Sequence, residues 1–303
     1  MNANQMTTAK QQPRFSVAIR TKSYQDMINN TLSDPARAAR FVASITSAVA
    51  ATPALQTTTP ASILACGLLG ESLNLSPSPQ LGQYYLVPFK QKAKYDRQGN
   101  LIAPERSTAT FIIGYRGLIQ LAIRSGQYKK LNVLEIKEGE LVGFDPLNEE
   151  IEVNLIQDFE EREAAPTVGY YAMFEYTNGF RKALYWSKQK MLSHAGHYSK
   201  AFSKQAYEKI QRGEIPERDM WKYYSFWYGD FDAMAKKTML RQLISKWGVM
   251  STEMQTAMAS DNTTVEMQDH DFVTTPVDEV PMEDPTLEEP EAEEPEEVKL
   301  GDL

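Results

Sequence analysis

Residues 111–118 have the sequence Phe-Ile-Ile-Gly-Tyr-Arg-Gly-Leu, and this stretch decides how the chain is organised. The apolar and β-branched run over 108–113 predicts a strand. Apolar residues at helical spacing follow and predict a helix that ends at Gly126. Two glycines join the strand to the helix, so the sequence predicts a chain that mixes both kinds of element.

The same stretch is a candidate phosphate site. Gly114 and Gly117 allow close backbone approach with N–H groups pointing outward, and a helix N-terminus favours a phosphate. Arg116 adds a bidentate donor and Tyr115 a face on which a base can stack. A tight turn with Arg116 on the surface explains the same residues, and the residues alone favour neither interpretation.

Two helices and a hairpin are predicted around this stretch on its N-terminal side. Ser33 is the expected N-cap of a helix to Ala51, and Thr59 begins a second helix to about Asn74. Strands over 84–89 and 108–113 form a hairpin with a long polar connection. Its tip carries three basic residues, Lys92, Lys94 and Arg97.

Strands and then helices follow on the C-terminal side. The strands are expected over 129–136, 151–155, 167–176 and 180–186, with a hairpin turn at Asn178-Gly179. The helices are expected over 187–192, 199–211 and 218–247. This order predicts an α+β fold with a mostly antiparallel sheet flanked by helices.

The chain ends differ from the body in composition. We expect a flexible arm over 1–32, in which a short helix can cover 24–29, a body over 33–250, and an acidic, largely disordered tail over 251–303. Residues 261–303 contain 16 Asp or Glu and one Lys, so the other 260 residues have 31 Lys or Arg and 24 acids. A basic body fits a polyanionic partner, although +7 over this length is also ordinary.

The composition predicts a cytoplasmic protein without a membrane partner. Cys66 is the only cysteine, no run of 18 apolar residues occurs, and the N-terminal segment has no apolar signal region.

Signals for enzyme chemistry are weak, and we expect no enzyme and no cofactor, while the effect of Mg²⁺ is left open. The chain has no Walker A sequence, and Gly114-x-x-Gly117 lacks the further glycine of a dinucleotide site. Glu135 and Lys137 at a strand end keep a Mg²⁺-dependent nuclease as the alternative function. A structural protein that only oligomerises is a third hypothesis.

The last predicted helix carries a cluster of basic residues beside an apolar stripe. Lys236 is in register with Leu243 and Trp247, and Lys237 and Arg241 border the same face. These cations can line a groove for phosphates, or their stems can snorkel along an amphipathic helix.

Aromatic and basic residues also alternate over 181–190, 198–204 and 221–228. This composition suits base stacking beside phosphate contacts, although core or subunit-interface roles explain most of the aromatics. The full set of candidate DNA-binding residues is Tyr115, Arg116, Arg124, Lys188, Lys190, Lys200, Lys236, Lys237 and Arg241.

Four ordered segments resemble the RecT family of phage and prophage single-strand annealing proteins. They are GLLGESLNL at 67–75, GQYYLVPF at 82–89, IIGYRGL at 112–118 and MAKKT at 234–238. The resemblance covers about residues 35–250 and implies an α+β core related to other annealing proteins.

The resemblance also implies what the protein does. Family members bind single-stranded DNA as rings or filaments of many copies, anneal a second strand to give duplex DNA without ATP, and act beside an exonuclease. It assigns DNA contacts to Arg116, Lys236, Lys237 and Arg241. The weaker candidates that it implies for DNA or subunit contacts are the basic residues of the hairpin tip, Lys92, Lys94 and Arg97. The acidic tail is expected to compete with DNA, to dock the exonuclease or a host single-strand-binding protein, or to be a passive solvated segment.

Overall fold

The computed structural model describes residues 13–91, 93–96, 98–99, 101–103, 105–199, 201–223, 225–268 and 271–277. The α+β class is confirmed, and all strand pairs are antiparallel among these residues. The described part of the chain divides into one compact unit of residues 13–191 and 230–277 and a second of residues 192–229, whereas the sequence treats 33–250 as one body. No helix in the described ranges is long and apolar enough to cross a membrane.

The helices and strands have the following bounds. The helices are α1 Phe15–Ala18, α2 Lys22–Leu32, α3 Pro35–Ala51, α4 Pro60–Ser72, α5 Tyr115–Arg124, α6 Phe159–Ala164, α7 Lys188–Tyr198, α8 Lys204–Gln211, α9 Phe226–Gly229, α10 Phe231–Trp247 and α11 Thr252–Ala259, with 3-10 turns at Pro53–Thr57 and Glu217–Lys222. The strands are β1 Tyr84–Gln91, β2 Lys94–Tyr95, β3 Leu101–Ala103, β4 Arg106–Ile113, β5 Tyr128–Lys137, β6 Leu141–Asp145, β7 Glu150–Val153, β8 Thr167–Tyr176, β9 Arg181–Ser187, β10 Thr263–Gln268 and β11 Asp271–Pro276.

The N-terminal arm predicted over 1–32 is wrong from residue 15 onward. Helices α1 and α2 occupy this region, and Phe15, Ile19 and Ile28 are buried. Ser33 is not the N-cap of α3: it has a left-handed conformation at the end of α2, while the Asp34 side chain accepts a hydrogen bond from Ala36 N–H. Burial of a few widely spaced apolar residues, which local periodicity does not reveal, accounts for the error.

The predicted acidic tail also begins too early. Helix α11 and the hairpin β10–β11 belong to the folded unit, because β10 pairs with β4 and Val265 is fully buried. Residues 1–277 therefore carry 31 Lys or Arg and 28 Asp or Glu, and residues 278–303 carry 12 acids and one Lys. The many acids after residue 277 dominate the average composition of residues 251–303, so the short strand pattern of β10 and β11 did not stand out.

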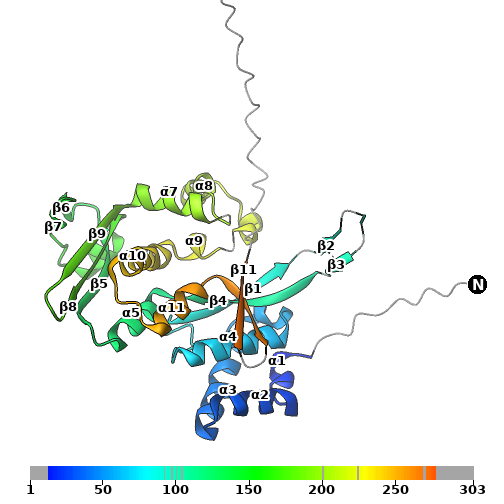
Figure 1. Cartoon of the computed structure of the whole chain (residues 1–303). Coiled ribbons are helices and arrows are strands. Elements are labelled where there is room, and N and C mark those ends of the chain that lie inside the picture. Colours follow the sequence, from blue (N-terminus) through cyan, green and yellow to red (C-terminus); the bar gives the residue numbers. More distant parts are fainter. Residues whose placement is uncertain are drawn as a thin grey trace, which may run out of the picture. The chain divides into compact units, whose positions relative to one another are not determined.

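Two sheets organise the larger unit (Figure 1). The first has the order β1-β4-β10-β11 and packs on α4, a helix that is buried on nearly every side. Tyr84 stacks on Phe111 with ring centres 5.0 Å apart. The second sheet has the order β5-β8-β9, and α10 lies across it. Helix α5, at the Gly-Tyr-Arg-Gly turn after β4, also contacts α10.

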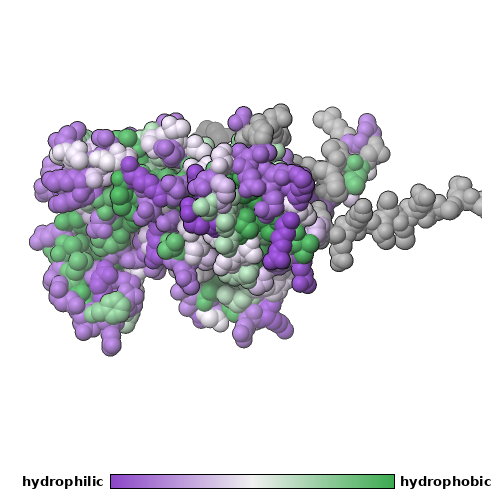
Figure 2. Space-filling view, turned by 90° about the horizontal axis from the view of Figure 1, so that it is seen from below, coloured by the Kyte–Doolittle hydropathy of each residue, from purple (hydrophilic) through white to green (hydrophobic). Residues whose placement is uncertain are grey.

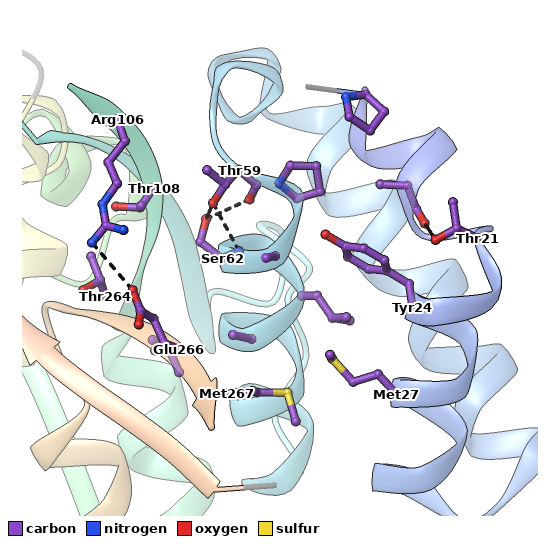
Figure 3. Close-up of a pocket in the computed structure, with 17 residues that line it drawn as sticks. Thr21, Tyr24, Met27, Thr59, Ser62, Arg106, Thr108, Thr264, Glu266 and Met267 are labelled. Atoms are coloured by element: carbon purple, nitrogen blue, oxygen red, sulfur yellow. Dashed lines mark hydrogen bonds and ion pairs between the residues drawn. The ribbon is translucent and has the colours of Figure 1, made fainter. Parts of the chain in front are cut away.

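A cavity of 610 Å³ lies between α2 and α4 and is bordered by β4 and β10. Figure 3 shows Tyr24 and Met27 of α2 pointing across it toward α4, with the Arg106–Glu266 ion pair at 3.6 Å on the β4–β10 side. None of the described candidate DNA-binding residues lines it. The exterior mixes hydrophobic and hydrophilic areas on the face seen in Figure 2.

Candidate nucleic-acid interface

The two glycines of the central turn are needed for packing. Gly114 N–H donates to the Gln83 carbonyl at 2.9 Å. A Cβ atom added to Gly114 would lie 2.1 Å from the Gly82 oxygen, and one added to Gly117 would lie 2.2 Å from the Gln83 oxygen. The glycines thus let the backbone before β1 touch the start of α5, and the Gly114 N–H is already used.

Arg116 is the exposed cation of this turn. Its Nη1 donates to the Gln80 carbonyl at 3.2 Å, and its Nε donates to the Tyr115 hydroxyl at 3.2 Å. These bonds hold the guanidinium at the N-terminus of α5, where the helix dipole and Arg116 both favour an anion. Arg116 therefore lies on the surface and is also placed to attract an anion, although the residues alone left these two interpretations as alternatives.

Tyr115 connects this turn to α10. The Nζ atom of Lys236 lies 4.9 Å from the centre of the Tyr115 ring, and the Arg116 guanidinium carbon lies 5.7 Å from it. A cation over an aromatic face is attracted to the ring quadrupole. The structure therefore brings Lys236 together with Tyr115 and Arg116, although Lys236 lies 120 residues after Arg116 in the sequence. We call these three residues the Tyr115 cluster.

Lys236 has an acidic partner that sequence reasoning missed. Its Nζ lies 2.6 Å from Glu135 Oε1, and the two side chains are 17% and 19% exposed. Burial alone would raise the pKa of Glu135, but the hydrogen bond and charge of Lys236 outweigh burial and lower that pKa. Burial likewise opposes the charge of Lys236, whose pKa is raised by Glu135. Both groups are thus charged, and their opposite charges largely cancel.

Lys237 and Arg241 share one acidic partner, Asp261. Lys237 Nζ lies 2.7 Å from Asp261 Oδ1, and Arg241 Nη1 lies 2.6 Å from Asp261 Oδ2. The Ile113 N–H also donates to Asp261 at 3.1 Å. The interpretation of Lys237 as part of the lining of a phosphate groove is not supported by its burial, because the residue is only 8% exposed. Asp261 was missed because the composition assigned it to the tail.

A comparison with known families identifies the chain. The RecT family model matches residues 39–275, which extends through β10 and most of β11. The chain belongs to the RecT family. This is a family of single-strand annealing recombination proteins, and its members bind single-stranded DNA and oligomerise.

Two relatives are similar along most of this RecT-family chain. A Bacillus subtilis protein named YqaK, described as uncharacterized, is 38% identical over 233 residues, which is 77% of this chain and 67% of YqaK. The RecT protein of Escherichia coli is 27% identical over 249 residues, which is 80% of this chain and 78% of that protein.

The other described candidate residues of this RecT-family chain contact residues outside the Tyr115 cluster. Arg124 donates to the carbonyls of Leu73 and Asn74 at 2.9 and 2.6 Å, and these hydrogen bonds satisfy backbone carbonyls at the C-terminal end of α4. Lys190 is exposed, with its Nζ 4.6 Å from the Trp186 ring centre, and Lys188 is half-buried at the start of α7. Lys200, Lys92, Arg97 and the Lys94 side chain lie outside the described residues.

The residues of the nuclease alternative are engaged in other contacts. Glu135 pairs with Lys236, and Lys137 is 8% exposed with its Nζ 3.2 Å from Thr167 Oγ1. Thr167 in turn donates to Asp232 at 3.2 Å. Within the part of the chain that the structure describes, no group of three His, Cys, Asp or Glu is placed to hold a metal ion.

Proposed function

We propose that this RecT-family chain binds single-stranded DNA and anneals complementary strands without ATP, acting as an oligomer or filament in phage recombination. Family membership supports annealing, and the chain has no Gly-x-x-x-x-Gly-Lys-Ser/Thr sequence that would bind a nucleoside triphosphate. The proposal includes no covalent step on DNA and no bound cofactor.

The Tyr115 cluster is the observation that carries the DNA contact. Arg116 is exposed at a helix N-terminus beside Tyr115, so its charge and the helix dipole face one region, while Lys236 over the same ring is paired with Glu135. Phosphate contacts fix a strand without reading its sequence. A strand held by its backbone presents its base edges, and a second strand then finds its register by Watson–Crick pairing.

The expected partners follow from the same function. An exonuclease supplies the single strand in the cytoplasm of a bacterial host, and a host single-strand-binding protein occupies it before the recombinase. Residues 278–303, with 12 acids and one Lys, form the acidic segment proposed to dock one of these proteins or to compete with DNA.

The test mixes the full chain with two complementary oligonucleotides carrying a fluorescence pair, without ATP, over a salt series in EDTA and in Mg²⁺. We expect accelerated pairing that weakens with salt and is lost in Arg116→Ala. Arg40→Ala, which removes an exposed cation on α3, is the matched control and should anneal normally.

Failure to accelerate pairing under every salt condition would remove the proposal. Strand cleavage in Mg²⁺ that disappears in Glu135→Ala would replace it with the nuclease alternative. Assemblies that form equally with and without DNA, and that do not pair strands, would favour a structural phage protein.

A further inference from the structure

The C-terminal end of α10 meets the turn between β8 and β9 in a second cluster of aromatic and basic residues. Phe180 stacks on Tyr176 with ring centres 5.8 Å apart and planes at 26°, and the Tyr176 hydroxyl donates to the Trp247 carbonyl at 2.8 Å. The Nζ atoms of Lys182 and Lys246 lie 4.4 and 5.7 Å from the Trp247 ring centre. We call these five residues the α10 platform.

The platform is accessible. Phe180 is 46% exposed and Trp247 is 39% exposed, although both are large hydrophobic side chains. Lys182 pairs with Glu149, and Lys246 is exposed with no ion pair among the residues that the structure describes. The platform thus combines an exposed aromatic ring with a cation that no acid of the described segments neutralises.

We infer that the α10 platform is a base-stacking subsite for single-stranded nucleic acid, with Phe180 as the stacking face and Lys246 as a phosphate contact. Aromatic rings beside cations are the composition of sites that bind single strands without sequence preference, because every base has a π-face. Lysine is depleted in protein–protein interfaces, so the exposed Lys246 beside Trp247 favours a polyanion over a subunit contact. The inference rests on the proposed function, because it extends the path of the same strand.

The spacing along α10 fits one strand that touches both clusters. Lys236 and Trp247 are 11 residues apart and lie on the same face of the helix, which is a separation of about 16 Å. A strand in B-form advances about 3.4 Å per nucleotide, so about five nucleotides would connect the two positions.

The experiment measures binding of Phe180→Ala to two probes of equal length, oligo-dT and a base-free deoxyribose phosphate oligomer. We expect the variant to bind oligo-dT at least about fivefold more weakly, which is the lower limit for loss of one stacked base, and to bind the base-free probe as the parent does. Lys246→Gln should reduce the salt dependence of binding to both probes. Phe159→Ala, which removes a 75% exposed ring on α6, is the control and should change neither.

Three outcomes would overturn the inference. Equal weakening on both probes would assign Phe180 a structural role, and unchanged binding to both would leave the platform without a nucleic-acid role. Loss of self-association with unchanged DNA affinity would make the platform a subunit interface. Arg116→Ala distinguishes these from failure of the proposed function, because it should still abolish annealing if only the platform inference is wrong.

Discussion

Replacing Asp261 by asparagine removes one negative charge from a buried ionic contact and keeps the size of the side chain. The carboxylate now accepts from Lys237, Arg241 and the Ile113 N–H. The Asp261 side chain is 3% exposed and that of Lys237 is 10% exposed. The variant therefore leaves a lysine cation beside the core of α10 without its counter-charge.

The expected loss follows from the exposure of the two cations. Removing one partner of a buried ion pair typically costs about 3–5 kcal/mol, because the remaining charge stays desolvated. The Arg241 side chain is 47% exposed, so its share is that of a surface pair, about 0–1 kcal/mol. We expect Asp261→Asn to lower the free energy of unfolding by about 3 kcal/mol, nearly all of it through Lys237.

Urea unfolding at neutral pH measures this loss. Glu266→Gln, in the same hairpin, is the matched control, since its pair with Arg106 is 3.6 Å long and about half exposed on both sides. The control should lose less than about 1 kcal/mol. Adding Lys237→Met to Asp261→Asn should recover stability, because the buried charge is then absent. A loss in Asp261→Asn no larger than in the control would refute the reasoning and return Lys237 to the set of DNA contacts.

Four further predictions concern other parts of the molecule. Glu135→Gln should steepen the slope of log affinity against log salt concentration by about 0.7 per protomer, because Lys236 loses its acidic partner and its charge becomes available to a phosphate. Glu138→Gln, the control, should leave this slope unchanged. In the same variant the free energy of unfolding should fall less steeply as pH is lowered. The lowered pKa of Glu135 means that this carboxylate stabilises the fold at pH above its ordinary pKa of 4.5, and that this stabilisation is lost as pH falls through the lowered pKa. Truncation after Val277 should leave the melting temperature unchanged, since β11 ends at residue 276. Gly117→Ala should cost about 1–3 kcal/mol in urea unfolding through its contact at 2.2 Å, and Gly143→Ala, which meets open space, should not show that overpacking cost.

Local pattern was sufficient for the strand–turn–helix of residues 108–124. The apolar and β-branched run of β4, whose middle residues are continuously buried, and the helical spacing in α5 are properties of neighbouring residues, and both elements have nearly the predicted bounds. The purpose of the glycines was not available from the pattern. It depends on the backbone of Gly82 and Gln83, which lie about 30 residues earlier in the chain.

The same limit applies to the charges of α10. Helical geometry placed the three cations close to the apolar stripe, but Lys237, predicted at its border, is itself buried, while Lys236 is half-buried and Arg241 is exposed. Their partners are Glu135 and Asp261, which are 101 and up to 24 residues away. Ion pairing between distant segments has no signature in a single sequence, so cations that are paired in the structure had the same pattern as free ones.

This pairing changes what a single copy of the chain can contribute to DNA binding. Glu135 and Asp261 neutralise cations of α10, and Arg124 is committed to backbone carbonyls, whereas Arg116 remains exposed without an ion pair among the described residues. Each phosphate contact to a single strand contributes about 0.7 to the salt slope, so one protomer with few such contacts binds weakly at physiological salt. Many weak contacts along one strand raise the overall affinity by effective concentration. The charge pairing seen within one copy therefore favours the proposal that this RecT-family chain holds DNA as an oligomer.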